Sequence, residues 1–265
     1  MAYSQAPQAS RFELKYLIDE RRAGAIRDFL GGYLEPDAYA RADQGNAYPV
    51  YSLYLDSPAL ALYRQTTHGL KNRFKLRIRF YDGQPESPAF LEIKRRQHDV
   101  ILKERAATTR PGVRRLLDHG HLDFAELVLG NGGASRAMAA ADRFWDLRAS
   151  LGAQEVLYVT YVREAYVSPG SSQVRVTFDR QIRACPYDRR EGLAVPAQGT
   201  PLSIGGVVLE LKFTDRFPAW MGEMVRAFNL QRRSMAKYVH CVEAMGFHLG
   251  RHTLLEGAKP WCRTG

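Results

Sequence analysis

The sequence predicts an α+β domain in which short strands are interrupted by helices. Three observations support this prediction. The chain contains a series of short runs in which apolar and polar residues alternate, as they do in half-buried strands. Other segments carry apolar residues at helical spacing. No internal repeat and no long linker divides the series, so we expect one domain over residues 11–248.

The N-terminal part of the chain predicts a strand, a helix and a second strand. Residues 11–18 alternate as a strand does. Asp19 predicts the start of a helix, because aspartate side chains cap helix N-termini, and the glycines at 31–32 would end it. The next strand is expected at 50–56, and residues 56–58 (Asp-Ser-Pro) favour a helix start there. Further strands are predicted at residues 74–81, 89–96 and 99–106.

The remainder of the chain adds more helices and strands. A long strand is predicted over 156–167, and residues 173–180 are expected to be its hairpin partner. Helices are predicted at residues 113–117, 124–129 and 135–151. The remaining elements are a loop at 189–201, a strand at 206–213, a helix opened by Pro218 and a helix at 234–245.

Composition narrows the classes of function. The 265 residues are 45% hydrophobic, which excludes an intrinsically disordered chain. Lysine and arginine number 38 against 28 aspartates and glutamates, so the formal net charge is +10. Such an excess predicts a polyanionic partner, which composition alone leaves open as nucleic acid, an anionic membrane or a phosphate chain.

The same reading predicts a cytoplasmic protein. Cys185, Cys241 and Cys262 are too few and too scattered for a disulfide framework. Residues 1–10 lack the apolar core of a signal peptide, and no window approaches the roughly 20 apolar residues of a membrane span. We expect residues 1–10 to be flexible and residues 249–265 to form a flexible basic tail.

The charged residues recur at every second position of the predicted strands, so they share one face of each strand. In residues 74–81 the even positions are all apolar, and Lys75, Arg77 and Arg79 occupy the odd positions. The same division of faces recurs in most of the other predicted strands. The charged faces carry Glu13 and Lys15; Glu92, Lys94 and Arg96; Lys103 and Arg105; Arg175 and Asp179; and Glu210 and Lys212. Arg163 interrupts the otherwise apolar strand at 156–167.

Two arrangements satisfy this pattern. In a flat sheet the cationic faces would all point to water, but solvated faces usually mix lysine, glutamate, threonine and serine. In a barrel closed around these faces they would line a cationic tunnel, with the apolar faces outward beneath helices. Packing like charges inward costs several kcal/mol per unpaired ion in order of magnitude, so a tunnel requires a bound polyanion and the interleaved carboxylates.

The single carboxylates then need a role. A glutamate among phosphate-binding cations would repel the ligand unless it holds a divalent metal that bridges to phosphate oxygens. Glu210 is the best candidate, because its strand carries only Glu210 and Lys212 as charges. For Glu13 and Glu92, pairing with neighbouring cations is an equal alternative.

These residues resemble the triphosphate tunnel metalloenzyme superfamily, and within it the VTC domain, the polyphosphate polymerase domain of the vacuolar transporter chaperone family, in a stand-alone bacterial-type form. The resemblance runs in family order over nearly the whole chain. It is carried by residues 11–16 (RFELKY), 52–57 (SLYLDS), 75–81 (KLRIRFY), 91–94 (LEIK), 103–105 (KER), Arg163, the Arg175 strand, 209–212 (LELK) and 236–238 (AKY).

The resemblance implies an eight-stranded antiparallel β-barrel tunnel with helices packed around it and a C-terminal helix. It implies a polyphosphate polymerase in which ATP binds inside the tunnel with Mn²⁺ or Mg²⁺, and the γ-phosphoryl group passes to a growing polyphosphate chain. The residues that match catalytic positions are Lys15, Arg77, Arg79, Lys94 and Lys103. Those expected to bind triphosphate or polyphosphate are Arg163, Arg175 and Lys237, together with Lys75 and Lys212 from the strand pattern. Glu210 matches the metal-holding glutamate.

Two departures and two alternatives accompany this resemblance. Ala236 stands where the family usually has serine, and the regulatory SPX domain and transmembrane segments of the eukaryotic complex are absent from the sequence, although a membrane partner protein remains open. Triphosphate hydrolases of the same fold carry Glu-x-Glu-x-Lys on the first strand, whereas Arg11 replaces the first glutamate here, which favours the polymerase. A non-catalytic module that binds polyphosphate or nucleotide is the second alternative. Base stacking on nucleic acid is disfavoured, because most strand aromatics lie on the apolar faces.

Overall fold

The computed structural model describes residues 11–40, 45–98, 100–120, 122–128, 134–171 and 173–247. The expected flexible N-terminus at 1–10 and tail at 249–265 lie outside these ranges. Within them, no helix is both long enough and apolar enough to cross a membrane.

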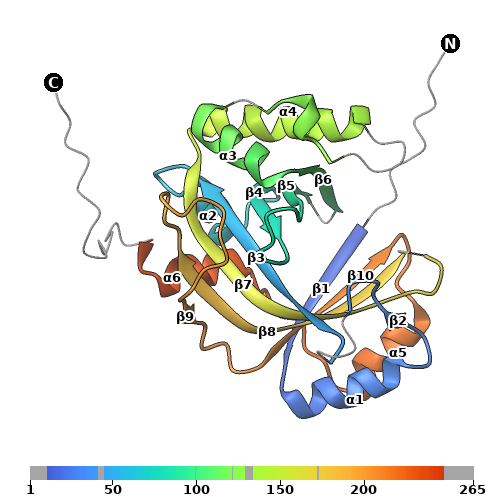
Figure 1. The fold of residues 1–265 in the computed structure, drawn as a ribbon. Coiled ribbons are helices and arrows are strands. Elements are labelled where there is room, and N and C mark those ends of the chain that lie inside the picture. The colour runs from blue at the N-terminus through green and yellow to red at the C-terminus, as the bar shows by residue number, and fades with distance from the viewer. Residues whose placement is uncertain are drawn as a thin grey trace.

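One antiparallel sheet forms the centre of the molecule (Figure 1). Its main path runs in the order β1-β10-β8-β7-β3-β4-β5-β6, while short β2 pairs with β7 and short β9 pairs with β8. The long strands are β1 (Arg11–Ile18), β3 (Ala47–Asp56), β4 (Asn72–Phe80), β5 (Ala89–Gln97), β6 (Val100–Thr108), β7 (Gln154–Val167), β8 (Val174–Pro186) and β10 (Val207–Thr214). The short ones are β2 (Glu35–Pro36) and β9 (Thr200–Pro201).

The sheet curves until its two edge strands approach each other. β1 and β6 lie in contact, but no ladder pairs them within the described residues. Side chains bridge the gap instead: the Lys94 ammonium on β5 lies 2.8 Å from a Glu13 carboxylate oxygen on β1. The predicted α+β tunnel fold is therefore confirmed, with the refinement that hydrogen bonds do not close the sheet into a continuous barrel.

Helices α1, α3, α4 and α5 cover the outer surface of the curved sheet, whereas α6 packs on its inner face against cavity-lining Tyr54 and Tyr161 (Figure 1). α3 and α4 pack over β4, β5 and β6, where Leu76, Ile93 and Phe144 belong to one buried apolar cluster. α1 and α5 pack beneath β1, β8 and β10 in a second cluster. The helices are α1 (Glu20–Leu30), α2 (Ala61–Thr67), α3 (Arg110–His119), α4 (Ala134–Leu151), α5 (Ala219–Ala227) and α6 (Lys237–Ala244). On β4 and β5 the apolar faces point outward, so their charged faces line the interior.

Local signals placed several elements correctly. The Asp19 side chain accepts a hydrogen bond from the Arg22 amide at 2.7 Å and caps α1, which ends at Gly31 as expected. β7 and β8 form the predicted hairpin. β1 begins and ends at the predicted residues.

Other boundaries differ from the prediction for identifiable reasons. α2 begins at Ala61 rather than near Pro58, although the Asp56 carboxylate still caps it by accepting from the Leu62 and Tyr63 amides at 2.8 and 2.9 Å. The segment predicted as a helix at 124–129 is one 3₁₀ turn, η2 (Phe124–Glu126). The last helix begins at Lys237 instead of Ser234, because an irregular segment precedes it.

Candidate active site

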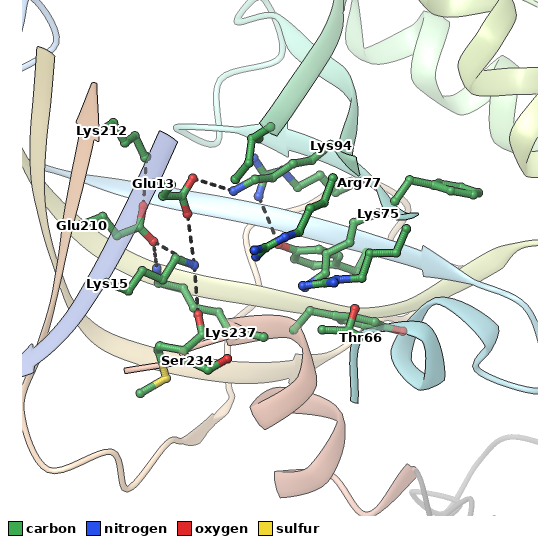
Figure 2. A pocket seen from close by; sticks show the side chains of 18 of the residues that line it. Glu13, Lys15, Thr66, Lys75, Arg77, Lys94, Glu210, Lys212, Ser234 and Lys237 are labelled. Carbon is green, nitrogen blue, oxygen red and sulfur yellow. Dashed lines mark hydrogen bonds and ion pairs between the residues drawn. The ribbon is translucent and has the colours of Figure 1, made fainter. Parts of the chain in front are cut away.

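The inner face of the sheet encloses a cavity of about 360 Å³ (Figure 2). Among the described residues, thirteen lysines and arginines line it, against two carboxylates. The basic residues are Lys15, Arg73, Lys75, Arg77, Arg79, Lys94, Arg95, Arg96, Arg163, Lys212, Arg232, Arg233 and Lys237, and the carboxylates are Glu13 and Glu210. The strongly positive balance of charge is complementary to a multiply charged anion.

Strand geometry brings the cations of β4 and β5 together. Lys75, Arg77 and Arg79 share one face of β4, as the two-residue period requires, and all three line the cavity. In the ladder, Lys75 is opposite Lys94, and Arg77 is opposite Glu92. The sequence pattern therefore placed these side chains on the correct face.

Glu92 lies on the same inner face of β5 as Lys94, outside the cavity lining, and it is fully buried. Its carboxylate oxygens lie 2.7 Å from Arg77, 2.6 Å from Lys103 and 3.3 Å from Arg105. Burial alone would raise the pKa of Glu92, but Arg79, Arg77 and the other cations hold it well below its usual range. The alternative of charge pairing, left open by the sequence, is the arrangement observed for Glu92.

Glu210 is the centre of a second cluster, on β10. Its carboxylate lies 2.8 Å from Lys237, 2.9 Å from Lys212 and 3.4 Å from Lys15 (Figure 2). Although burial raises the pKa of Glu210, Lys212 and Lys237 keep it well below its usual range. Glu210 is therefore held ionised at the cavity wall.

A buried aspartate, Asp179, supports the same cluster. Arg163 donates two hydrogen bonds to its carboxylate, both at 2.7 Å, and the Lys237 ammonium lies 2.6 Å away. Lys237 itself is only 8% exposed, at the first residue of α6. Burial lowers the pKa of Lys237, but Asp179 and Glu210 outweigh this and raise it, so the ammonium stays charged. Only the family resemblance suggested a site role for Lys237.

Two of the expected site residues do not line the cavity. Lys103 lies on edge strand β6, is 36% exposed and is bound to Glu92. Arg175 on β8 forms an ion pair with Asp37 and donates a hydrogen bond to the Tyr48 hydroxyl at 3.0 Å. Lys103 and Arg175 lie on the predicted inner face of their strands, but each forms an ion pair with a carboxylate that does not line the cavity. The other expected residues, Lys15, Lys75, Arg77, Arg79, Lys94, Arg163, Lys212, Lys237 and Glu210, come together around it.

The sequence reasoning did not assign several lining residues to the site. Arg73 shares the parity of Lys75, so a strand start at Asn72 would have identified it. The irregular segment between α5 and α6 contributes Arg232, Arg233 and Ser234. It has no regular residue spacing from which the direction of its side chains could be predicted. Two bonds hold that segment against β1: the Arg233 amide donates to the Lys15 carbonyl at 2.9 Å, and the Lys15 ammonium donates to the Met235 carbonyl at 2.9 Å.

Glu13 and Glu210 could bind a divalent metal if both carboxylates and the substrate phosphates supplied ligands to it. Glu13 and Glu210 both face the cavity, and the Lys15 ammonium bridges them at 3.2 and 3.4 Å. Among the described residues, no group of three or more His, Cys, Asp or Glu side chains could hold a metal ion. Mg²⁺ is commonly bound by one or two carboxylates together with substrate phosphates, and this pair suits that mode of binding.

Comparison with known proteins gives one family match and a set of similar structures. The family model described as the VTC domain matches residues 10–246. No curated protein matches the sequence. PH1819 from Pyrococcus horikoshii is 13% identical, with 88% of this chain and 98% of that chain covered and a TM-score of 0.45. HpAC1 from Hippeastrum, described as having a dominant triphosphatase activity, is 12% identical, with coverage of 90% and 96% and a TM-score of 0.49.

Proposed function

The chain belongs to the VTC domain family, and we propose that it is a polyphosphate polymerase that transfers the γ-phosphoryl group of ATP to a growing polyphosphate chain. The observation that carries the proposal is the cavity, in which thirteen basic side chains and two carboxylates face one another inside the sheet. Such a site suits a linear chain of phosphates better than a duplex or a membrane surface, because the cations converge on one enclosed volume.

The cations would perform most of the catalysis. Phosphoryl transfer needs the donor and acceptor aligned and the charge on the transferring group neutralised. Arg77, Arg79 and Lys94 would clamp the triphosphate, since guanidinium groups bind phosphate oxygens in pairs and lysine acts as a compact charge. Lys103 lies outside the cavity and would act through Glu92, which also binds Arg77. Arg175 is bound by Asp37 away from the cavity.

The second cluster would position the reacting ends. Lys15 lies between Glu13 and Glu210, close to the place where the γ-phosphoryl group or the acceptor end would sit. Arg163, Lys212 and Lys237 would hold the remaining phosphates. No general base is required, because the terminal phosphate of the acceptor chain is already anionic.

A divalent metal, Mn²⁺ or Mg²⁺, would be held by Glu210 with Glu13 and the phosphate oxygens, and would neutralise charge on the triphosphate. The displaced ammonium groups of Lys15 and Lys237 would then be available to phosphate. Two carboxylates at the cavity are few for activating a water molecule, which supports a polymerase over a hydrolase of the same fold.

The test is a comparison of ADP release from ATP with Mn²⁺ in matched variants. We expect Lys237→Met to lower the rate by about 10²–10³-fold, as loss of one preorganised charge does, and Glu210→Gln to abolish metal-dependent turnover while the protein still folds. Lys71→Met is the control, because Lys71 is exposed and lies outside the cavity. Near-normal turnover in both site variants, or no turnover in the unchanged protein, would contradict the proposal.

A further inference from the structure

Lys75 differs from the other lysines that line the cavity. Each of the others forms an ion pair with a carboxylate: Lys15, Lys94, Lys212 and Lys237 contact Glu13, Glu210 or Asp179. The side-chain ammonium of Lys75 forms no hydrogen bond or ion pair with any described residue, although Lys75 is half-buried at the cavity wall (Figure 2). It is therefore an amine that the folded protein leaves uncompensated.

The surroundings of Lys75 disfavour its charged form. Burial is the largest cause, and the nearby charges of Lys15, Lys94, Arg73 and Arg77 add to it, so the pKa of Lys75 lies well below its ordinary value. Lys94 is its direct partner across the β4–β5 ladder. A larger share of Lys75 is consequently a neutral amine, which is the nucleophilic form.

The same neighbours create a phosphate site beside this amine. Arg73 and Arg77 stand two residues before and after Lys75 on the same face of β4, and both line the cavity. Guanidinium groups there would bind a phosphate, and the cavity of about 360 Å³ is roomy for a small molecule. A reagent that carries a phosphate next to an electrophilic carbon would be held with that carbon close to the amine.

We propose that Lys75 is an acylation site for acyl phosphates, of which acetyl phosphate is the simplest. The lone pair of Nζ attacks the carbonyl carbon, forming the N–C bond of an amide. The bond between that carbon and the bridging oxygen breaks, and inorganic phosphate leaves with the electron pair. The nitrogen loses one proton to water or to the departing phosphate. Acylation removes an amine that a bound triphosphate would protonate, so the modified protein would bind triphosphate more weakly.

The experiment measures acylation of individual lysines by peptide mass spectrometry after incubation of the full chain with acetyl phosphate. Lys71 is the internal reference, since it is exposed and lies outside the cavity. We expect the initial rate at Lys75 to exceed that at Lys71 severalfold, because a phosphate bound by Arg73 and Arg77 would hold the carbonyl carbon beside the Lys75 amine. Tripolyphosphate should suppress the modification of Lys75 and leave that of Lys71 unchanged.

A second reagent separates phosphate binding from simple reactivity. The N-hydroxysuccinimide ester of acetate has no phosphate, so it should show a smaller preference for Lys75 over Lys71 than acetyl phosphate does. Equal rates at the two lysines with acetyl phosphate, or no protection by tripolyphosphate, would overturn the proposal. The readout is the mass of a peptide and not turnover, so this result stands or falls separately from the polymerase activity.

Discussion

At the scale of single residues, the interior of the tunnel is a set of carboxylates that each hold several cations. Glu92 contacts arginine and lysine side chains from β4 and β6, and Glu210 contacts lysines from β1, β10 and α6. In the absence of phosphate these carboxylates keep like charges together at a tolerable electrostatic cost. The arrangement also orients the cations, since each is fixed by its carboxylate before any ligand arrives.

The clearest structural test of this role is Glu92→Gln. The substitution keeps the shape of the side chain but leaves Arg77, Lys103 and Arg105 without their buried counter-charge. We expect the free energy of unfolding to fall by about 3–5 kcal/mol in urea denaturation, as when one partner of a buried ion pair is removed. Glu104→Gln on β6 is the matched control, because its 33% exposed carboxylate makes longer ion pairs, and about 0–1 kcal/mol is expected. Equal losses in the two variants would contradict the role of Glu92.

Lys75 gives a prediction about protons. Because burial and cationic neighbours lower its pKa in the free protein, a bound triphosphate should raise that pKa again. Binding therefore takes up a proton, and affinity should decrease as pH rises. Calorimetric titration of tripolyphosphate in two buffers of different ionisation enthalpy measures the uptake. Lys75→Arg keeps the charge but cannot titrate, and it should take up fewer protons than the unchanged protein; identical uptake would refute the assignment.

Residue placement could be predicted from the sequence where the backbone has a strict period. Strand parity identified Arg77, Arg79 and Lys94 because successive strand residues must face opposite sides. The same logic fails for Lys237, whose position at the first turn of α6 depends on how that helix meets Asp179. It also fails for Arg232 and Arg233, which lie in a segment with no repeating geometry.

At the scale of elements, α6 is joined to the end of β3 by a pair of tyrosines. The Tyr238 hydroxyl donates to the Asp56 carboxylate at 2.8 Å, and its ring stacks on Tyr54 with centroids 4.7 Å apart. The Tyr54 hydroxyl in turn accepts from Arg77 at 3.1 Å. Lys237 is the residue next to Tyr238. The contacts of Tyr238 with Asp56 and Tyr54 therefore also position the Lys237 ammonium in the cavity.

Removing the Tyr238 hydroxyl should weaken the packing of α6 against β3. Tyr238→Phe leaves the ring in place but takes a donor from buried Asp56, and we expect a loss of about 1–2 kcal/mol in the free energy of unfolding. Tyr63→Phe is the control, since its hydroxyl reaches Glu243 only at 3.5 Å in an exposed position, and a change within about 0.5 kcal/mol is expected. Thermal or urea denaturation measures both, and a neutral Tyr238→Phe would contradict this account of α6.

The order of the elements could be predicted more fully than their ends. β8 runs past the predicted limit of Arg180 to Pro186, because a bulge shifts its register against β7 between Thr160 and Val162. Before the bulge Phe178 packs toward α1, and after it Ile182 packs toward α6. The alternation of apolar and polar residues is interrupted at the bulge, so it could not predict the second half of β8. The two-residue strands β2 and β9 are too short to carry any periodic signal.

At the scale of the whole molecule, the positive charge is concentrated at one site. Thirteen basic residues and two carboxylates line the cavity, so its excess of positive charge is as large as that of the entire chain. Composition left nucleic acid, membrane and phosphate chain open as partners. The enclosed position of the charges favours the phosphate chain, because a duplex or a bilayer needs an exposed basic surface.

The open edge between β1 and β6 also belongs to this scale. The sequence could predict cationic inner faces, but the closure of a sheet depends on strand tilt and stagger, which residue parity does not encode. The ion pair between Lys94 and Glu13 joins strands at the two sides of that edge.

The central claim, that the tunnel builds polyphosphate, is tested most directly by the balance of products from ATP. The purified protein is incubated with ATP and Mn²⁺, ADP and free phosphate are measured together, and the products are separated on a gel stained for polyphosphate. A polymerase predicts ADP in large excess over free phosphate and a ladder of polyphosphate chains. Equal amounts of ADP and free phosphate with no ladder would contradict the claim and assign the tunnel to hydrolysis.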